Sequence, residues 1–268
     1  MSQGDVASDP QVSLIVVDFN AGAQLARCLE SALKCDDVPN EVVVVDNASS
    51  DGSALAAAAR FPEVRFLRNE SNLGFAAAAN LGLAIARGRL IGLLNPDVEL
   101  PPGALPKLSA FLAEHPRIGA VGPALLGIDG TPQPFSYGGD PSLTYLVRRG
   151  WGRVRGQTLH PWSGGDARAV DWVSGACLIA RREAWEQVGL LDEGFFLYFE
   201  DVDWCRRCRQ HGWDVYFVPE VEVTHLSHAS YADRARRQYY SAGLQRYYQK
   251  HFGPLAGWIL KTALLRQR

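Results

Sequence analysis

The chain has 268 residues, of which 47% are hydrophobic and 21% are charged, as in a globular protein with a sizeable core. This composition excludes collagen, a coiled coil and wholesale disorder. Lys and Arg number 27 against 29 Asp and Glu, and the resulting net charge of −2 argues against a nucleic-acid-binding protein.

The charge is unevenly distributed along the chain. From Arg234 to Arg268 there are eight Lys or Arg residues and no Asp or Glu, so this segment carries +8. The remaining residues therefore carry a net charge of −10. The near-neutral total conceals an acidic body and a basic tail.

The first half of the chain alternates between two hydrophobic periods. Buried β-branched runs predict strands, and apolar residues at helical spacing predict helices. We expect strands at 12–17, 41–45, 64–67 and 90–94, and helices at 25–33, 54–60, 75–86 and 104–114. Such alternation with short connections predicts an α/β fold, a Rossmann-like, mostly parallel sheet with helices on both faces.

The periodic pattern stops at 127 and resumes near 169. The intervening segment is rich in Gly, Pro, Arg and Trp, which predicts a long surface loop. Beyond it we expect a strand at Val170, helices near 182–188, 201–211 and 234–251, and strands within 215–224. The predicted organisation is a flexible N-terminus (1–10), a main domain (11–230) with halves 11–126 and 169–230 around a variable loop (127–168), and a basic amphipathic helical tail (231–268).

The cysteines and the first residues bear on the cellular compartment. Five cysteines are an odd number in a long chain, which predicts reduced thiols and a cytoplasmic protein. Cys205 and Cys208 have the spacing of a redox or zinc site, but they lie in a predicted helix and are more simply explained as buried helix residues. The first ten residues are polar, and no apolar run reaches the roughly 20 residues of a membrane span.

Polar residues follow three of the predicted strands. They are Asp18 with Asn20, Asp46 with Asn47, and Asn95 with Asp97. Ligands of open parallel sheets bind beyond the carboxyl ends of the strands, so these side chains are candidates for a binding site. Helix caps and turns explain Asn47 and Asn95 equally well, but they explain a cluster of carboxylates less well.

A nucleotide is one possible ligand at this edge. An acidic residue after the second strand can hold a ribose, as Asp46 would. The chain has neither G-x-G-x-x-G nor a Walker lysine motif, so phosphates would need another means of neutralisation. A divalent cation with oxygen ligands is one such means, and Asp97 is the candidate ligand.

Several motifs resemble those of family-2 glycosyltransferases, most closely the bacterial rhamnosyltransferase-like branch. The resemblance extends from Val12 to Ser230, and the matching segments are 12–20, 43–53, 72–76, 93–98, 173–177 and 195–203. It implies a GT-A fold, a nucleotide-diphosphate sugar donor, Mg²⁺ or Mn²⁺, and inversion at the anomeric carbon. No Q-x-x-R-W motif is present, which favours a non-processive enzyme.

The resemblance also implies roles for individual residues. Asp201 of the pair Glu200–Asp201 would be the general base, and Asp97 and His225 would face the metal or the diphosphate. The residues expected to bind the donor nucleotide are Asn20, Asp46, Asn47, Asn72, Gly74, Asn80 and Asn95. Those expected near the acceptor are Trp172, Ser174, Gly175, Arg148 and Arg149.

The basic tail and the long loop bear on where in the cell the protein would bind its acceptor. Apolar and basic residues of the tail favour a helix lying on anionic lipid, although a helix packed on the domain explains them too. We expect a peripheral protein on the inner face of the cell membrane, with a lipid-linked or glycan acceptor. A homodimer is compatible with the sequence.

The leading hypothesis is an inverting transferase that moves rhamnose from dTDP-rhamnose to a hydroxyl of the acceptor. The same motifs admit another donor, such as UDP-galactofuranose. A nucleotidyltransferase typically has a Gly-rich basic loop after the first strand, which Asp18–Gly22 lacks. A non-catalytic sugar-nucleotide-binding module remains as the third alternative.

Overall fold

The computed structural model describes residues 10–35, 38–142, 144–145, 148, 151–152, 155–156, 162, 164–226 and 233–257. The predictions for Arg149 and for the ends of the chain, 1–9 and 258–268, lie outside the described residues.

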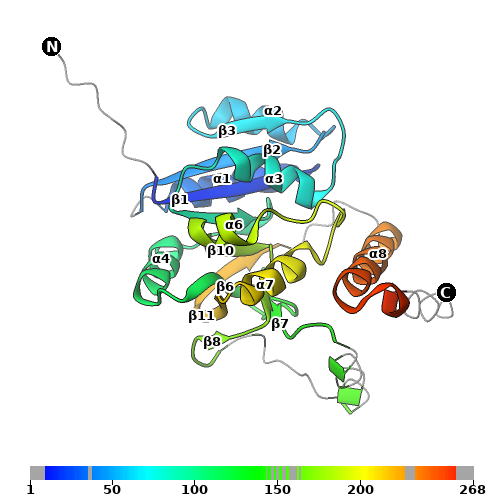
Figure 1. The fold of residues 1–268 in the computed structure, drawn as a ribbon. Helices are drawn as coiled ribbons and strands as arrows, with labels where there is room; N and C mark the ends of the chain where they lie inside the picture. Colours follow the sequence, from blue (N-terminus) through cyan, green and yellow to red (C-terminus); the bar gives the residue numbers. More distant parts are fainter. Residues whose placement is uncertain are drawn as a thin grey trace.

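A mixed sheet runs through the described part of the chain (Figure 1). Its strand order is β3-β2-β1-β4-β10-β6-β11-β5, with β8 paired to β11. The strands are β1 (Val12–Asp18), β2 (Asn40–Asp46), β3 (Arg65–Arg68), β4 (Leu90–Leu94), β5 (Val98–Glu99), β6 (Ile118–Leu126), β8 (Arg168–Ala169), β10 (Cys177–Arg181) and β11 (Asp214–His225). The long strands run in one direction except β10, which is antiparallel to both β4 and β6, so the prediction of a mostly parallel sheet is confirmed.

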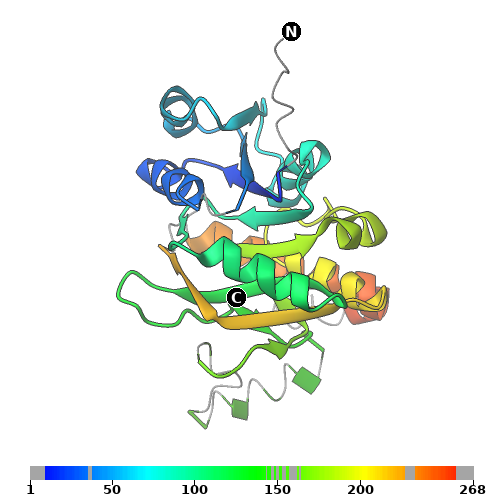
Figure 2. The same ribbon diagram turned by 90° about the vertical axis from the view of Figure 1, so that its left-hand side faces the viewer.

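Helices cover both faces of this sheet (Figure 2). One face packs against α1 (Ala23–Leu33), α2 (Ser53–Arg60) and α4 (Ala104–Glu114). The other packs against α3 (Phe75–Ile85), α6 (Arg182–Val188) and α7 (Glu200–Gln210). Alternate residues of β1 point to the two faces, Leu14 into the first core and Ile15 into the second, which is why the strand is apolar throughout. The predicted α/β fold is confirmed.

Strand β6 is absent from the sequence-based prediction. Gly119, Gly122 and Pro123 interrupt its hydrophobic run. In the structure both glycines are required by close packing, because a Cβ on Gly119 would lie 2.8 Å from Trp213 and one on Gly122 would lie 2.6 Å from Val173. The predicted long loop also contains a short strand, β7 (Tyr137–Gly138), which pairs with β9 (Trp172–Val173).

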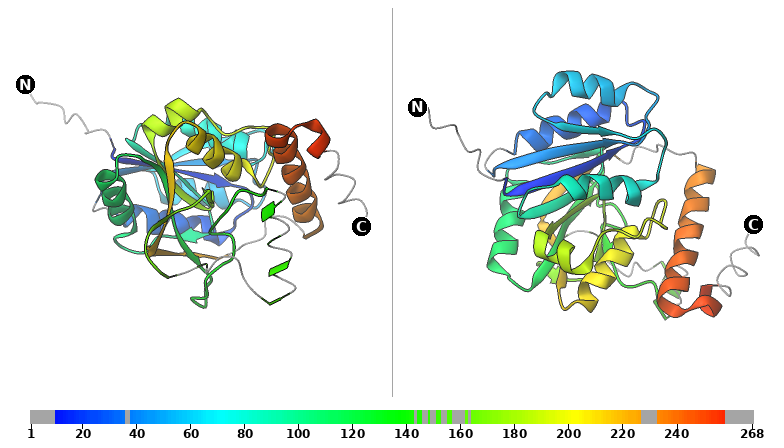
Figure 3. Two further views of the ribbon diagram at one scale, coloured as in Figure 1. Left: turned by 60° about the horizontal axis from the view of Figure 1, so that its bottom comes forward. Right: turned by 45° about the horizontal axis from the view of Figure 1, so that its top comes forward.

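Most of the described part of the basic tail forms α8 (Asp233–Phe252), which lies at the side of the sheet toward which β1 and β2 run (Figure 3). Its residues Leu244, Tyr247 and Tyr248 are buried in a third cluster with Phe195 and Phe199. Hydrogen bonds from α8 reach acidic residues of the body, so this part of the tail packs on the domain. Among the described residues, no helix is long and apolar enough to cross a membrane.

All five cysteines lie within the described residues, and all are buried and outside any disulfide. Burial raises the pKa of the Cys208 thiol to about 12, and the pKa of Cys205 is likewise raised. A protonated, buried thiol is neither a nucleophile nor a metal ligand. Cys205 and Cys208 are buried helix residues, as the sequence predicted, and the reduced state of the thiols stays a prediction.

Candidate active site

Three strand ends meet at one edge of the sheet. Asp18 and Asp46 are register partners at the ends of β1 and β2. Asn95 follows β4, and its backbone N–H donates to the carbonyl oxygen of Ala176 at 2.9 Å. Parallel strands therefore bring these predicted residues together, as the sequence pattern indicated.

Asp18 is fully buried and serves the loop that follows β2. Its Oδ2 accepts hydrogen bonds from the hydroxyls of Ser49 (3.2 Å) and Ser53 (2.9 Å), and its Oδ1 accepts one from the N–H of Ala21 (3.2 Å). Burial raises the pKa of this carboxyl, although the Ser53 bond opposes the rise. Asp18 thus fixes the loops that follow β1 and β2, and its carboxylate is not exposed to solvent.

Asp46 is also nearly buried, with 3% exposure, and lies beside a basic residue. Its Oδ1 accepts the N–H of Ser49 at 2.8 Å, and its Oδ2 lies 3.5 Å from Nε of the exposed Arg68. Asp46 therefore has one carboxylate oxygen facing an exposed cationic neighbour, and this oxygen can accept a hydrogen bond from a ribose hydroxyl or a base.

Asn47 and Asn72 organise the loop between β3 and α3. Nδ2 of Asn47 donates to Oδ1 of Asn72 at 2.8 Å, and Oδ1 of Asn47 accepts the N–H of Leu73 at 3.0 Å. Oδ1 of Asn72 also accepts the N–H of Gly74 at 2.9 Å. Gly74 has a φ of 85° directly before α3, and a Cβ there would lie 2.6 Å from the carbonyl oxygen of Phe196. These side chains set the backbone of the expected donor cleft, and their contact with a nucleotide stays a prediction.

The other predicted donor residues differ in position. Asn20, with a φ of 55°, accepts the N–H of Ser50 at 2.8 Å and so joins the two loops beyond β1 and β2. Asn80 is buried in α3, where its amide both donates to and accepts from the backbone of Leu191 at 3.0 Å. The structure thus brings Asn20 to the strand-end edge and gives Asn80 a bond to the loop before α7. A nucleotide contact for Asn80 stays a prediction.

Asp97 and His225 lie together although 128 positions separate them in the numbering. They are joined by the pairing of β5 with β11, in which Val98 is the register partner of His225. Nε2 of His225 is 3.3 Å from Oδ1 of Asp97, and Asp97 is only 6% exposed. The resemblance had placed both residues at the metal, and the structure brings them to one point.

The donor set of this pair fits a divalent cation held partly by substrate. Within the described residues, no group of three or more His, Cys, Asp or Glu could hold a metal by itself. Mg²⁺ is commonly bound by one or two carboxylates together with phosphates and water, and an imidazole suits Mn²⁺. One carboxylate and one imidazole therefore match a metal whose remaining ligands are diphosphate oxygens and water.

Glu200 and Asp201 open helix α7, directly after two residues with positive φ, Tyr198 (72°) and Phe199 (74°). Burial raises the pKa of Glu200 well above its usual value, and the Asp201 charge adds to the effect. Burial also raises the pKa of Asp201, against the backbone hydrogen bonds from Gly175 and Val202. Burial therefore disfavours the charged form of Glu200 and increases the basicity of Asp201.

A short segment joins Asp201 to the strand-end edge. The N–H of Gly175 donates to Oδ2 of Asp201 at 2.8 Å, and the next residue, Ala176, accepts the N–H of Asn95. The base candidate and the segment leading to Asp97 are thus connected through two adjacent residues. This contact could not be read from the sequence, because Gly175 and Asp201 are 26 positions apart.

The predicted acceptor residues lie partly at this edge. Ser174 and Gly175 belong to the segment that contacts Asp201. Trp172 is half-buried, and its indole N–H donates to the carbonyl oxygen of Gly139 at 2.9 Å. Arg148 is exposed. Contact with an acceptor stays a prediction for all of them.

The turn before α7 has contacts that sequence reasoning missed. The N–H of Phe75, at the start of α3, donates to the carbonyl oxygen of Phe196 at 2.7 Å. The ring of Phe196 stacks on Tyr239 of α8 with centroids 4.7 Å apart. The aromatic run 195–199 therefore connects α3, the pair Glu200–Asp201 and α8. The run lies within a segment that resembles the family, but nothing in the sequence identified its partners.

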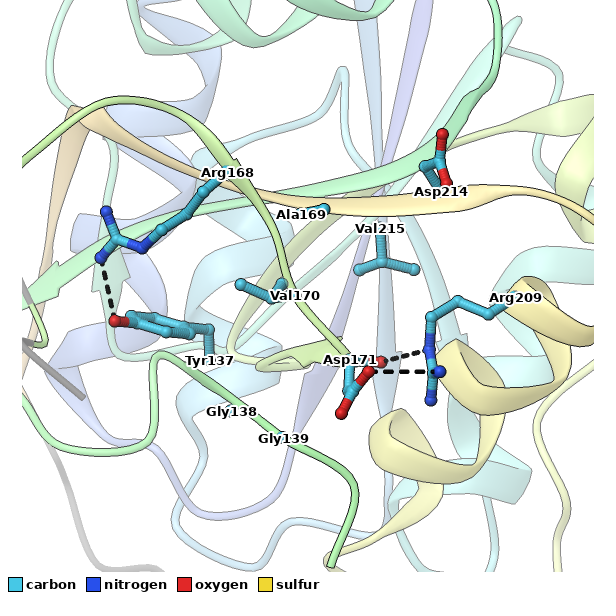
Figure 4. A pocket seen from close by; sticks show the side chains of 10 residues that line it. All are labelled: Tyr137, Gly138, Gly139, Arg168, Ala169, Val170, Asp171, Arg209, Asp214 and Val215. Atoms are coloured by element: carbon cyan, nitrogen blue, oxygen red, sulfur yellow. Dashed lines mark hydrogen bonds and ion pairs between the residues drawn. The ribbon is translucent and has the colours of Figure 1, made fainter. Parts of the chain in front are cut away.

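A pocket of about 700 Å³ lies elsewhere (Figure 4). Asp214 of its lining begins β11, whereas His225 ends that strand. Arg209 of the lining is already paired with Asp171 at 3.2 Å and with Asp140 at 2.7 Å. None of the predicted site residues that the structure describes lines this pocket.

Comparison with known proteins relates the chain to glycosyltransferases. The model of the family described as "Glycosyltransferase like family 2" matches residues 10–241. The N-acetylglucosaminyl-diphospho-decaprenol L-rhamnosyltransferase of Mycobacterium tuberculosis is 34% identical over 234 residues, which cover 79% of this chain and 75% of that protein. The low-salt glycan biosynthesis hexosyltransferase of Haloferax volcanii is 25% identical over 69% of this chain and 58% of its own length.

Solved structures share the fold. GalNAc-T7 with UDP, GalNAc and Mn²⁺ superposes with a TM-score of 0.64 at 18% identity, covering 89% of this chain and 48% of that one. The mannosyltransferase PcManGT from Pyrobaculum calidifontis, in complex with GDP-Man and Mn²⁺, gives 0.61 at 21% identity, covering 92% of this chain and 65% of that one. The fold is therefore GT-A, and the chain belongs to glycosyltransferase family 2, in its rhamnosyltransferase-like branch.

Proposed function

We propose that the protein is an inverting, non-processive transferase that moves a sugar, rhamnose from dTDP-rhamnose, to a hydroxyl of a lipid-linked or glycan acceptor. The observation that carries this proposal is the placement of Asp201 next to the segment that leads to the Asp97–His225 pair. A base on one side and a diphosphate-binding pair on the other are what a single displacement at the anomeric carbon requires.

In this reaction the acceptor oxygen bonds to the anomeric carbon while the bond from that carbon to the diphosphate breaks. Asp201 accepts the proton that the acceptor hydroxyl loses. Burial raises the pKa of Asp201, which brings its basicity closer to neutral pH and suits a general base. The hydrogen bond from Gly175 holds the carboxylate in place, and burial raises the pKa of Glu200, which disfavours a second negative charge beside the diphosphate.

Asp97 and His225 are the residues that would hold Mg²⁺ or Mn²⁺ in this proposal. When bound, the metal supplies positive charge that stabilises the diphosphate leaving group. Asp46, Asn20 and the loop held by Asn72 would line the nucleotide. Both solved neighbours were determined with Mn²⁺ and a nucleotide or sugar nucleotide, which supports this assignment by analogy of fold.

The donor and the acceptor are inferred from the mycobacterial relative, whose name specifies a rhamnosyl transfer to a diphospho-decaprenol lipid. A donor such as UDP-galactofuranose is the runner-up within the same chemistry. A nucleotidyltransferase or a non-catalytic module would leave unexplained why a buried acid pair lies beside the diphosphate edge.

A lipid-linked acceptor would bring the protein to the inner face of the membrane as a peripheral protein. Trp151, with 63% exposure, and Leu255, with 71%, are apolar groups available to an interface, and Arg155 stacks over Trp151 at 5.4 Å. Deletion of residues 253–268 is expected to reduce flotation with anionic vesicles but to leave binding to zwitterionic vesicles unchanged. Equal flotation of both forms would contradict membrane association through the tail.

The transfer is tested by a donor screen followed by one substitution. Thermal shift with dTDP-rhamnose, UDP-galactofuranose and other sugar nucleotides, with and without Mn²⁺, identifies the donor. Asp201→Asn, which keeps an acceptor for the Gly175 N–H, is expected to lower transfer by roughly 10²- to 10⁴-fold while the donor-induced shift persists.

Asp214→Asn is the matched control, because this carboxylate begins β11 far from the edge and is paired only with the exposed Arg117 among the described residues. It should retain full transfer. An Asp201→Asn enzyme with undiminished transfer would refute the base assignment, and a wild-type protein that responds to no sugar nucleotide would refute the transferase function.

A further inference from the structure

Gln133 has a defined place although it lies in the segment predicted to be a loop. Its backbone N–H donates to the carbonyl oxygen of Leu125 at 2.8 Å, and the turn before it is closed by a bond from Gly127 to Thr131 at 2.8 Å. Gln133 is therefore held beside the end of β6, on a segment that turns back antiparallel to it. Leu126 at the end of β6 is the register partner of Thr224 in β11, and His225 is the next residue.

Both ends of the Gln133 amide contact the same histidine. Oε1 lies 2.7 Å from Nδ1 of His225, and Nε2 donates to the backbone carbonyl oxygen of His225 at 2.6 Å. A carbonyl oxygen can only accept, so the amide end facing it must be the NH₂ group. The end facing Nδ1 is consequently the oxygen, and Nδ1 must carry the proton in that bond.

A proton on Nδ1 determines what the other ring nitrogen can do. In a neutral imidazole the lone pair is then on Nε2, the atom that faces Oδ1 of Asp97 at 3.3 Å. Two lone-pair donors thus face one point, as in a histidine–carboxylate metal site. Metal-bound histidines generally donate their second N–H to a partner that fixes the ring and the tautomer.

We propose that Gln133 is a positioning residue that holds His225 as the Nδ1–H tautomer, so that Nε2 is directed with Asp97 toward a divalent cation. The tautomer assignment follows from the amide contacts alone. Its consequence for the cation rests on the proposed metal-assisted transfer. Gln133 itself contacts neither the cation nor the substrate.

The first test is the ¹⁵N spectrum of histidine-labelled, metal-free protein at mildly alkaline pH, with His225→Gln to assign the signals. The wild type should show His225 protonated on Nδ1. Gln133→Glu keeps an oxygen for the Nδ1–H and should retain this tautomer. Gln133→Leu removes the acceptor and should shift His225 toward the Nε2–H form, which can donate to Asp97.

The second test is Mn²⁺ binding followed by electron paramagnetic resonance, with Mn²⁺ alone and with Mn²⁺ plus dTDP or UDP. Gln133→Leu should weaken Mn²⁺ binding roughly 10- to 100-fold, and Gln133→Glu should retain it. Thr131→Val is the control, because Thr131 is exposed in the same turn and bonds only Asp129 by its side chain among the described residues. Circular dichroism checks that each variant is folded.

The outcomes separate the two levels of the proposal. An Nε2–H or doubly protonated His225 in the wild type would overturn the assignment, whatever the variants do. An unchanged Mn²⁺ affinity in folded Gln133→Leu would overturn the positioning role. If wild-type protein has the Nδ1–H tautomer but binds no Mn²⁺ with either nucleotide, the assignment stands and the metal-assisted transfer fails.

Discussion

Asp203 provides the most quantitative prediction, because it is a fully buried carboxylate that joins α7 to α8. Its oxygens lie 2.9 Å from Nε of Arg207, 2.8 Å from Nζ of Lys250 and 2.7 Å from Nε2 of His251. Burial disfavours the charged form, but the bonds from His251 and Lys250 outweigh it and lower the pKa of Asp203. The carboxylate is therefore the common anion that fixes α8 to the body.

Asp203→Ala should remove this anion and leave three basic groups around an apolar space. Loss of one partner from a buried ion pair costs roughly 3–5 kcal/mol. Two of the bases retain other partners, since Arg207 also donates to the carbonyl oxygen of Val188 and Lys250 to Asp192. We therefore expect the lower end of that range, about 3 kcal/mol off the free energy of unfolding.

Urea unfolding followed by far-ultraviolet circular dichroism measures this loss. Asp214→Ala is the matched control, because its ion pair with Arg117 spans 3.7 Å and both side chains are exposed. An exposed pair contributes at most about 1 kcal/mol, so the control should be close to wild type. Limited proteolysis should also cleave α8 sooner in Asp203→Ala. Equal losses of stability in the two variants would refute the account of Asp203 as the anchor of α8.

Two further predictions concern the same junction. A Cβ at Gly243 of α8 would lie 2.6 Å from the carbonyl oxygen of Tyr198, so Gly243→Val should displace the turn before Glu200. Such overpacking costs roughly 1–3 kcal/mol, and kcat for transfer should fall more than donor affinity, whereas Val at the exposed neighbour Ala242 should change neither. Burial opposes ionisation of Asp192, but hydrogen bonds from Lys250 and Arg246 lower its pKa to about 2. The stabilisation from Asp192 is therefore complete above the unfolded pKa near 3.9 and is lost as the pH falls toward 2, so acid unfolding of Asp192→Asn should show a weaker pH dependence in this window.

Local patterns were sufficient for most elements. The strand β4 and the helices α4 and α6 begin and end where the hydrophobic periods predict, because one face of each element packs into a core. Strand β6 could not be predicted, since its glycines are selected by contacts with Trp213 and Val173, which lie far along the chain. A glycine that is required by a contact with a distant residue interrupts the hydrophobic period from which a strand is predicted.

The candidate site shows the same division. The strand ends predicted that Asp18, Asp46 and Asp97 would share one edge. The register of β1 with β2 and with β4 brings the ends of these three strands together. The accessibility of each carboxylate did not follow from the pattern. The sequence made Asp18 a candidate ligand. In the structure its carboxylate instead accepts hydrogen bonds from the hydroxyls of Ser49 and Ser53 and stabilises the loop after β2.

The charge of the tail is the clearest case of tertiary structure deciding a role. Composition alone established a basic segment after residue 233, and two destinations for it were open. In the structure Arg246 and Lys250 pair with Asp192, and His251 pairs with Asp203.

The sequence by itself determined the fold class, the family and the edge of the sheet where chemistry is expected, because hydrophobic period and strand-end motifs are local signals. Only the tertiary structure decided which side chains complete that edge. Gln133 meets His225 across 92 positions and Asp203 meets His251 across 48. Such hydrogen bonds follow from the packing of whole elements and leave no periodic trace in the chain.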